Sequence, residues 1–377
     1  MRVAILESIV MPAGHEVEFD RILVEELKKQ GHEPVFFVPE HFPFKLDYHC
    51  DVEYLDGGEV VTYAGAGKLK KIFLSLIRER RRVAWFNSAY DKACAHHCDA
   101  IIIPTGTWRY IRTILRSNLK ASPIPVYIIF HGINPHEQPK FEKQARKVES
   151  YQNIHLKVIT LRDDFKDSGL HNVDLIAPPV FKPWGLTVNK CLSFKPPIKI
   201  GFFGQFRKEK NLGFFLEAFT KASFTVPVEL IVQGATAKPE DGELFEQFAR
   251  DYRNYKNITF LHKNLIGIEW QKALLSVDAI MMPYAAERYR YHWGAMLFTA
   301  IGFYKPVLVS PELNPEVLQQ FKIGQAIDLS SVEAFSHQLE RFIDDLVHHT
   351  EEYQQGLDQA NVVYGQDKLI KGILKSI

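Results

Sequence analysis

The chain alternates short, continuous apolar runs with longer segments whose apolar residues recur every three to four positions. The first run, Val3–Leu6, is followed by a helical pattern over Val17–Gln30, and Pro34–Val38 is the next run. Runs without polar alternation are typical of strands buried on both faces, as in a parallel sheet covered by helices. The pattern therefore predicts an α/β fold with doubly wound parallel sheets.

The alternation occurs twice, on either side of a proline-marked stretch from Pro178 to Pro197. Five strands are predicted in the second series: Ile198–Phe203, Val228–Val232, Ile258–Leu261, Ala279–Met282 and Pro306–Val309. The 377 residues are also enough for about two domains. We predict a first Rossmann-like domain over residues 1–180 and a second over residues 190–357.

Composition excludes several classes of protein. The 46 basic and 45 acidic side chains nearly cancel, which argues against a nucleic-acid partner. Four cysteines are too few for a disulfide framework, and Cys94–Cys98 lacks the second ligand pair of a zinc site, so we expect no metal. Residues after Met1 make a poor signal peptide, and no apolar stretch approaches the roughly 18 residues that span a bilayer. We expect a cytoplasmic protein.

The most informative segment is Gly201–Asn211, in which a strand, a glycine turn and two cations precede a helix. In doubly wound sheets, ligands bind at the carboxyl ends of the strands. Gly204 allows close approach of the backbone, and Arg207 and Lys210 bring positive charge to the same place. A diphosphate suits such a cluster, although a solvated helix start explains these cations equally well. The spacing is neither G-x-G-x-x-G nor a P-loop.

The segment Phe203–Asn211 resembles the F-G-x-I-R-x-Y-K-N motif of GT-B glycosyltransferases in the large retaining, nucleotide-sugar-dependent group (family 4-like). The resemblance implies two Rossmann-like domains facing a cleft, and a C-terminal helix, about residues 358–377, packed back on the first domain. It also implies a donor diphosphate held without metal or cofactor. The residues concerned are Gly204, Gln205, Arg207 and Lys210.

The resemblance continues through the second half of the chain. Further donor-binding residues would be Gly234, His262, Tyr284, Glu287, Gly294 and Ala295. The family's E-x7-E pair would fall on Tyr291 and Thr299, which are not carboxylates, and Glu287 is the nearest substitute. The polar segment around Glu287 is either a solvated loop or part of a pocket for an acidic sugar, bound by Arg288 or Arg290. Retaining or inverting stereochemistry stays open.

Two histidines in the first half are candidate catalytic residues. His15 lies in the loop where GT-B enzymes approach the acceptor, and would deprotonate a hydroxyl there. A histidine at a helix start is also commonly a cap or a surface residue. His131 follows the run Val126–Phe130 and resembles the strand-end histidine that contacts the donor sugar in retaining members. Four more residues would line the acceptor side: Gly14, Glu16, Thr105 and Thr107.

The segment Lys68–Arg82 interleaves seven cations with apolar residues such as Leu69, Phe73 and Leu76. A basic amphipathic helix of this kind binds an anionic membrane surface, here at the inner face, or covers the sheet as an ordinary surface helix. The sequence leaves both interpretations open.

The resemblance implies an enzyme that moves a sugar from a nucleotide-diphosphate donor to a hydroxyl acceptor. The acceptor would be a glycan or lipid-linked glycan in the assembly of cell-envelope polysaccharide or lipopolysaccharide. One alternative is a GT-B sugar-nucleotide epimerase or phosphorylase, and another is a catalytically degenerate GT-B binding protein, motivated by Tyr291 and Thr299.

Overall fold

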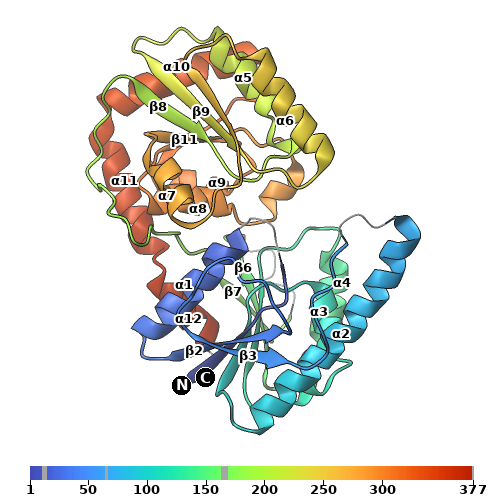
Figure 1. The fold of residues 1–377 in the computed structure, drawn as a ribbon. Coiled ribbons are helices and arrows are strands. Elements are labelled where there is room, and N and C mark those ends of the chain that lie inside the picture. Colours follow the sequence, from blue (N-terminus) through green and yellow to red (C-terminus); the bar gives the residue numbers. More distant parts are fainter. Residues whose placement is uncertain (11–14, 64–66, 163–168, 376–377) are drawn as a thin grey trace. The chain divides into compact units, whose positions relative to one another are not determined.

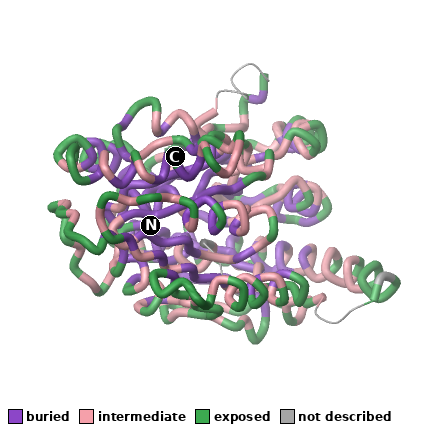
Figure 2. Tube along the Cα trace, turned by 90° about the horizontal axis from the view of Figure 1, so that it is seen from above, coloured by how far each residue is buried: buried purple, intermediate pink, exposed green. Residues whose placement is uncertain are grey.

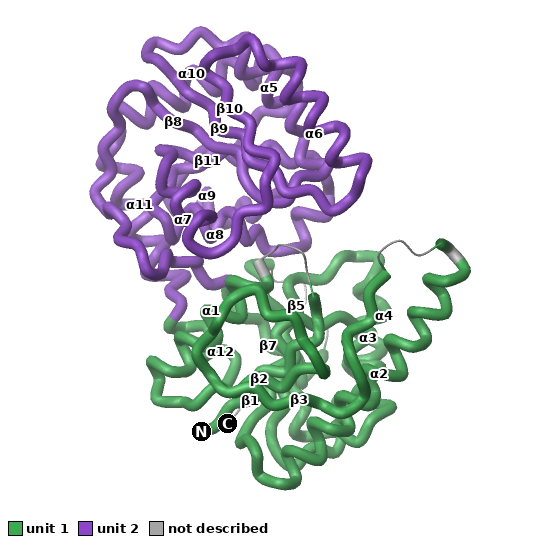
Figure 3. The backbone as a smooth tube through the Cα atoms, in the orientation of Figure 1, with its two compact units in different colours: residues 1–11, 15–177, 367–377 green, residues 12–14, 178–366 purple. Residues whose placement is uncertain are grey.

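The computed structural model describes residues 1–10, 15–63, 67–162 and 169–375, which divide into two compact units (Figure 3). Unit 1 contains the described part of residues 1–177 together with the C-terminal residues from Asp367, and unit 2 contains residues 178–366. The chain passes from unit 1 to unit 2 after Ala177 and returns to unit 1 at Asp367. Each unit contains one parallel sheet.

Unit 1 is built on a seven-stranded sheet with the order β3-β2-β1-β4-β5-β6-β7. The strands are β1 (Arg2–Leu6), β2 (Glu33–Pro39), β3 (Asp51–Leu55), β4 (Ala100–Ile103), β5 (Val126–Phe130), β6 (Ile154–Ile159) and β7 (Val173–Ile176). The helices are α1 (His15–Lys29), α2 (Lys68–Cys94), α3 (Trp108–Ile114), the 3-10 helix η1 (Asn118–Ala121), α4 (Gln138–Val148) and α12 (Asp367–Leu374). The strand order reverses between β1 and β4, which makes this the switch point of the sheet.

Helices cover both faces of this sheet (Figure 1). The helices α1 and α12 pack against each other on one face, and α12 also contacts β7. The helices α2, α3 and α4 lie on the other face. Every residue of β4 and β5 is buried, which explains why these strands are apolar without alternation, and Figure 2 shows burial concentrated in the strands.

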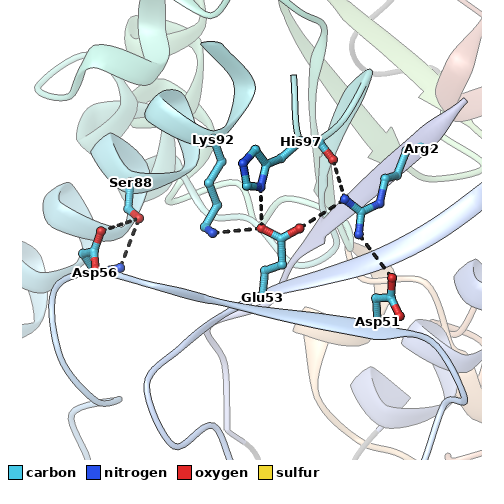
Figure 4. A network of polar contacts seen from close by, with 7 residues as sticks. All are labelled: Arg2, Asp51, Glu53, Asp56, Ser88, Lys92 and His97. Carbon is cyan, nitrogen blue, oxygen red and sulfur yellow. Dashed lines mark hydrogen bonds and ion pairs between the residues drawn. The ribbon is translucent and has the colours of Figure 1, made fainter. Parts of the chain in front are cut away.

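A polar network fastens the amino end of β1 to β3 and to the end of α2 (Figure 4). Arg2 pairs with Asp51 and with Glu53, each at 3.2 Å. Glu53 also accepts hydrogen bonds from Lys92 Nζ at 2.9 Å and pairs with His97 Nδ1 at 2.8 Å. The network therefore stabilises the end of the sheet that lies opposite the carboxyl ends of the strands.

One lysine of unit 1 is completely buried. Lys157 lies on β6, and its Nζ donates to Asp174 of β7 at 2.6 Å. The ring of Tyr127, on β5, is centred 5.5 Å from the same Nζ. Lys157 and Asp174 are direct partners in the register of the two strands, so the ion pair links the last two strands of the sheet.

Unit 2 contains a six-stranded parallel sheet with the order β10-β9-β8-β11-β12-β13, which reverses between β8 and β11. The strands are β8 (Ile198–Phe202), β9 (Val228–Gly234), β10 (Ile258–His262), β11 (Ala279–Met282), β12 (Val307–Val309) and β13 (Gly324–Ala326). The helices are η2 (Lys208–Lys210), α5 (Leu212–Lys221), α6 (Pro239–Asp251), α7 (Gly267–Leu275), η3 (Glu287–Arg290), α8 (Ala295–Gly302), α9 (Pro315–Gln320), α10 (Val332–His348) and α11 (Thr350–Val363).

In unit 2 as well, helices lie on both faces of the sheet (Figure 1). The helix α10 packs along α5, and α11 packs against α8. Two parallel, helix-covered sheets confirm the predicted α/β class with two doubly wound units.

Candidate functional site

The loops after β8 and β11 bring several predicted donor-binding residues to the switch point of unit 2. Gly204 follows β8 and Tyr284 follows β11, and these two strands are neighbours in the sheet. Gly204 has a φ of +100°, and a Cβ at this position would lie 3.3 Å from Lys210 Nζ. A glycine is required for this turn, which places the backbone directly beside the lysine.

Lys210 is held against an aromatic ring. Its Nζ lies 4.7 Å from the centre of the Tyr284 ring and donates to the carbonyl oxygen of Phe203 at 3.3 Å. Burial lowers the pKa of Lys210 to about 7, and the cations of Arg207 and Arg288 act in the same direction. A bound anion would favour the charged form of this lysine.

Glu209 contacts three other polar side chains of this site. Its Oε1 accepts a hydrogen bond from Arg288 Nη2 and lies 3.7 Å from Arg207 Nη1 and 3.5 Å from the Tyr289 hydroxyl. Arg207 Nη2 also donates to Gln205 Oε1 at 3.0 Å. We name Arg207, Lys210 and Arg288 the cation cluster. The Glu209 carboxylate pairs with the two arginines and interacts electrostatically with Lys210, so positive charge is in excess.

The remaining donor-side predictions fall on residues with structural contacts of their own. A Cβ at Gly234 would lie 2.4 Å from the ring of Phe245, so this glycine permits close packing at the end of β9. His262 is bonded through both ring nitrogens, Nδ1 to Glu246 and Nε2 to the Thr236 hydroxyl at 3.0 Å. These packing and hydrogen-bonding contacts give Gly234 and His262 a structural role within unit 2.

At the start of α8, the N–H of Gly294 donates to Asn314 Oδ1 at 2.7 Å in a buried hydrogen bond. This N–H group therefore has a partner within unit 2, and the assignment of Gly294 to the donor-binding site stays a prediction. Ala295 is the first residue of α8 and is half-buried. Glu287 is exposed and accepts a hydrogen bond from the Tyr291 hydroxyl at 3.4 Å.

In unit 1, three predicted residues lie at the carboxyl ends of the neighbouring strands β4 and β5. His131 Nε2 donates to the carbonyl oxygen of Pro104 at 2.8 Å, and the His131 ring meets Phe19 edge-on at 4.7 Å. A carbonyl can only accept, so Nε2 carries a proton. Thr105 lies in the loop after β4, and Thr107 directly precedes the first residue of α3.

Other acceptor-side predictions fall at the start of α1. His15 is its first residue, but the His15 side chain and the whole of Gly14 lie outside the part of the chain that the structure describes. Glu16 lies in the first turn of α1 and is half-buried.

Sequence analysis missed a buried acidic pair beside Glu16. Glu7 directly follows β1, and its Oε1 accepts from the backbone N–H groups of Ser8 and Ile9. Burial raises the pKa of Glu7 to about 8. Burial also raises the pKa of Asp20 well above its usual range, and the Glu7 and Glu16 charges add to this effect. The signal was an acid placed directly after the first apolar run.

The Cys94–Cys98 segment brings no metal ligands together. Cys94 is exposed, Cys98 is buried, and His97 pairs with Glu53. Among the residues that the structure describes, no group of three or more His, Cys, Asp or Glu side chains is arranged to hold a metal ion.

The basic segment Lys68–Arg82 lies in α2, and its two halves differ. Four side chains form an exposed apolar stripe: Leu69, Ile72, Phe73 and Leu76, each with 63–85% of its surface exposed. Lys70 and Lys71 are exposed beside them. Arg82 is instead buried and pairs with Glu79 at 2.7 Å, and the residues after it pack on the sheet. The first half of α2 therefore presents apolar and basic side chains to solvent.

No helix in the described ranges has the length and apolar character needed to cross a membrane.

Comparisons of the sequence and the structure with known proteins give information on the fold. No family model and no curated protein matches the chain. HepE of Anabaena, crystallised with UDP and glucose, is 13% identical with a TM-score of 0.64, and all of both chains is covered. A glycosyltransferase of Rickettsia africae is 12% identical with a TM-score of 0.68, covering 99% of this chain and 98% of that one. The lipopolysaccharide outer core galactosyltransferase WaaB is 13% identical with a TM-score of 0.60 over all of both chains.

These similarities confirm the predicted GT-B fold.

Proposed function

We propose that the protein is a glycosyltransferase that moves a sugar from a nucleotide-diphosphate donor to a hydroxyl group. The observation that carries this proposal is the cation cluster at the switch point of unit 2. Ligands of doubly wound sheets bind at such points, and the excess positive charge suits a diphosphate. A similar protein, HepE, was crystallised with UDP and glucose, which supports a nucleotide sugar as the donor.

The cation cluster would act on the leaving group. When the bond between the anomeric carbon and the diphosphate breaks, negative charge develops on the diphosphate. Arg207, Lys210 and Arg288 would stabilise that charge more strongly than the charge of the intact donor, and this difference lowers the barrier. The proposal needs no metal and no cofactor, because the charge is balanced by side chains.

The acceptor would approach the carboxyl edge of the sheet in unit 1. His131 is oriented there by its bond to Pro104, and we assign to it a contact with the transferred sugar. His15 would take the proton of the acceptor hydroxyl, because an imidazole titrates near working pH. Gly14, Glu16, Thr105 and Thr107 remain the proposed acceptor-side residues.

We further propose that the acceptor is a glycan or lipid-linked glycan of the cell envelope. The name of the similar protein WaaB, a lipopolysaccharide outer core galactosyltransferase, supports this class. The exposed apolar stripe of α2, with Lys70 and Lys71 beside it, fits the inner face of an anionic membrane, where each cation contributes about 1 kcal/mol.

The donor proposal is tested with a panel of nucleotides and nucleotide sugars, by thermal shift and calorimetry. We expect one nucleotide sugar to stabilise the wild type and Arg207→Ala to bind it at least ~10-fold more weakly, since a charge-assisted contact is worth about 1.5–3 kcal/mol. Lys208→Ala is the matched control, because this neighbouring cation is exposed. If no nucleotide binds the wild type, or both variants weaken binding equally, the donor site is wrongly assigned.

Product analysis separates the remaining functions. Transfer to a glycan acceptor supports the proposal, whereas isomerisation of the sugar nucleotide without acceptor indicates an epimerase. Binding with neither hydrolysis nor transfer indicates a degenerate binding protein.

The membrane proposal is tested by co-sedimentation with phosphatidylcholine vesicles, with and without phosphatidylglycerol. We expect Leu69→Ser combined with Phe73→Ser to reduce binding to the anionic vesicles by ~10-fold or more, from loss of two apolar side chains worth about 1.5–3 kcal/mol each when fully buried. Tyr54→Ser removes an exposed aromatic residue elsewhere on unit 1 and is the control. Equal binding by all three proteins would show that the stripe does not contact the membrane.

A further inference from the structure

Trp108, the first residue of α3, is surrounded by three cations. Its ring centre lies 4.8 Å from Arg109 Cζ, 5.2 Å from Arg112 Cζ and 5.6 Å from Lys140 Nζ. The arginines come from α3 and the lysine comes from α4, which packs against α3. We call these four residues the Trp108 cluster.

The positive charge of the Trp108 cluster is only partly balanced. Arg112 Nη2 pairs with Glu79 at 2.8 Å, but Glu79 also pairs with Arg82 at 2.7 Å. Arg109 and Lys140 are exposed and form no ion pair with any residue in the described ranges. Cation–π contacts at exposed sites contribute about 0.5–1 kcal/mol each, which helps to hold like charges close together. The cations are therefore already close together before an anion binds between them.

Unsatisfied polar atoms lie in the same part of unit 1. Trp108 Nε1 and the hydroxyl oxygen of Thr105 are buried and have no hydrogen-bond partner among the residues that the structure describes. Buried polar groups are nearly always paired, and a water molecule or a ligand can supply the missing partner of such atoms. These two atoms are therefore available to a ligand, which is an observation separate from the charges.

The position of the Trp108 cluster matches the edge of the sheet where a ligand is expected. Thr105 and Trp108 follow β4, and Lys140 lies in the first turn of α4, which follows β5. His131 directly follows β5 at the same end of the sheet. In doubly wound sheets this is the ligand-binding edge.

We propose that the Trp108 cluster binds an anionic group of the acceptor, a phosphate or carboxylate carried on a sugar. This inference rests on the proposed function and specifies its acceptor class. Arg109 and Arg112 lie three residues apart and therefore face the same side of α3, and guanidinium groups bind phosphate or carboxylate in a bidentate manner. A neutral sugar offers no charge to replace the water around these cations, so the cluster selects acidic acceptors.

The test compares glucose 6-phosphate with glucose by calorimetry at low and moderate salt. We expect the sugar phosphate to bind and glucose to bind at least ~10-fold more weakly, since charge-assisted hydrogen bonds are worth about 1.5–3 kcal/mol. The double variant Arg109→Gln/Lys140→Gln should lose this preference. Arg116→Gln/Lys147→Gln removes the same charge from exposed positions after α3 and on α4, and should behave as the wild type.

Three results would overturn the proposal: equal binding of the two sugars, an unchanged Arg109→Gln/Lys140→Gln variant, or equal losses in both double variants. A fourth comes from vesicles containing phosphatidylglycerol. If the cluster variant loses only vesicle binding while no protein binds glucose 6-phosphate, the cluster contacts lipid headgroups and is not an acceptor site.

Nucleotide binding to each variant distinguishes this inference from the proposed function. The Trp108 cluster belongs to unit 1 and the cation cluster to unit 2, so we expect unchanged nucleotide binding in both double variants.

Discussion

The two switch points of the molecule share one topology and carry different ionisable groups. In unit 1 the sheet reverses between β1 and β4, and in unit 2 between β8 and β11. The loop after β1 begins with the buried acid Glu7, which lies near Asp20. The loop after β8 leads instead to Arg207 and Lys210.

This difference teaches that topology determines where a ligand can bind, whereas the residues after each strand determine which ligand. An excess of cations attracts a diphosphate, which supports the proposal that the donor binds to unit 2. A buried carboxyl group that keeps its proton near neutral pH is uncharged. It therefore repels a diphosphate less than a carboxylate would, but it does not attract one as a cation does. Proton transfer to or from an acceptor is the chemistry that better suits unit 1.

The largest effect that we predict from the difference between the two switch points is a pH dependence of nucleotide binding at unit 2. The pKa of Lys210 is lowered to about 7 by burial and by neighbouring cations, and a bound diphosphate would raise it again. The affinity should therefore be constant below pH 7 and fall above it, by up to about tenfold per pH unit. Calorimetry at pH 8 in buffers of different ionisation enthalpy should also detect uptake of a proton.

Lys210→Arg is the control, because a guanidinium stays charged across this range. Its nucleotide affinity should not change between pH 7 and pH 9. A wild type whose affinity is equally constant would show that Lys210 is not in contact with the nucleotide.

A smaller effect is expected at the switch point of unit 1, on stability. The pKa of Glu7 is raised from 4.5 to about 8, so between these values the folded protein holds a proton that the unfolded chain releases. The free energy of unfolding should therefore decrease as pH rises from 5 to 8, by at most about 1.4 kcal/mol per pH unit from this group. Glu7→Gln should weaken this decrease, as measured by urea unfolding.

Glu40→Gln removes an exposed carboxyl group of unit 1 and should follow the wild-type profile. If the stability of Glu7→Gln has the same pH dependence as that of the wild type, Glu7 is ionised in the folded protein. The proposed difference between the two switch points would then be wrong.

Much of the fold could be predicted because the central strands are mostly apolar, and β4, β5 and β11 contain no charged residue. The strands that escaped prediction lack this signal for physical reasons. In β3, Asp51–Leu55, most residues are exposed at the edge of the sheet, and β13, Gly324–Ala326, is only three residues long. In β6 the apolar run is interrupted by Lys157, whose charge is balanced by a partner on another strand.

From local chemistry alone, the candidate site could be predicted only where its residues are close in sequence, whereas Tyr284 was predicted from the family resemblance. Gly204, Arg207 and Lys210 belong to one short segment, and the sequence suggested their chemistry directly. The pairing of Arg288 with Glu209 joins positions 79 residues apart and depends on β8 and β11 becoming neighbours. The buried state of Glu7 depends likewise on α1 covering it, and a single sequence contains no direct record of that contact.

The ion pair between the buried Lys157 of β6 and the exposed Asp174 of β7 has a consequence for how unit 1 folds. If β7 paired one residue out of step, Asp174 would point to the opposite face of the sheet, and the buried Lys157 would lose this partner. Removing a partner from a buried charge is destabilising, so the misaligned sheet would be less stable than the correct one. We therefore expect the pair of Lys157 and Asp174 to favour the correct register of β6 and β7, the last two strands of the sheet in unit 1.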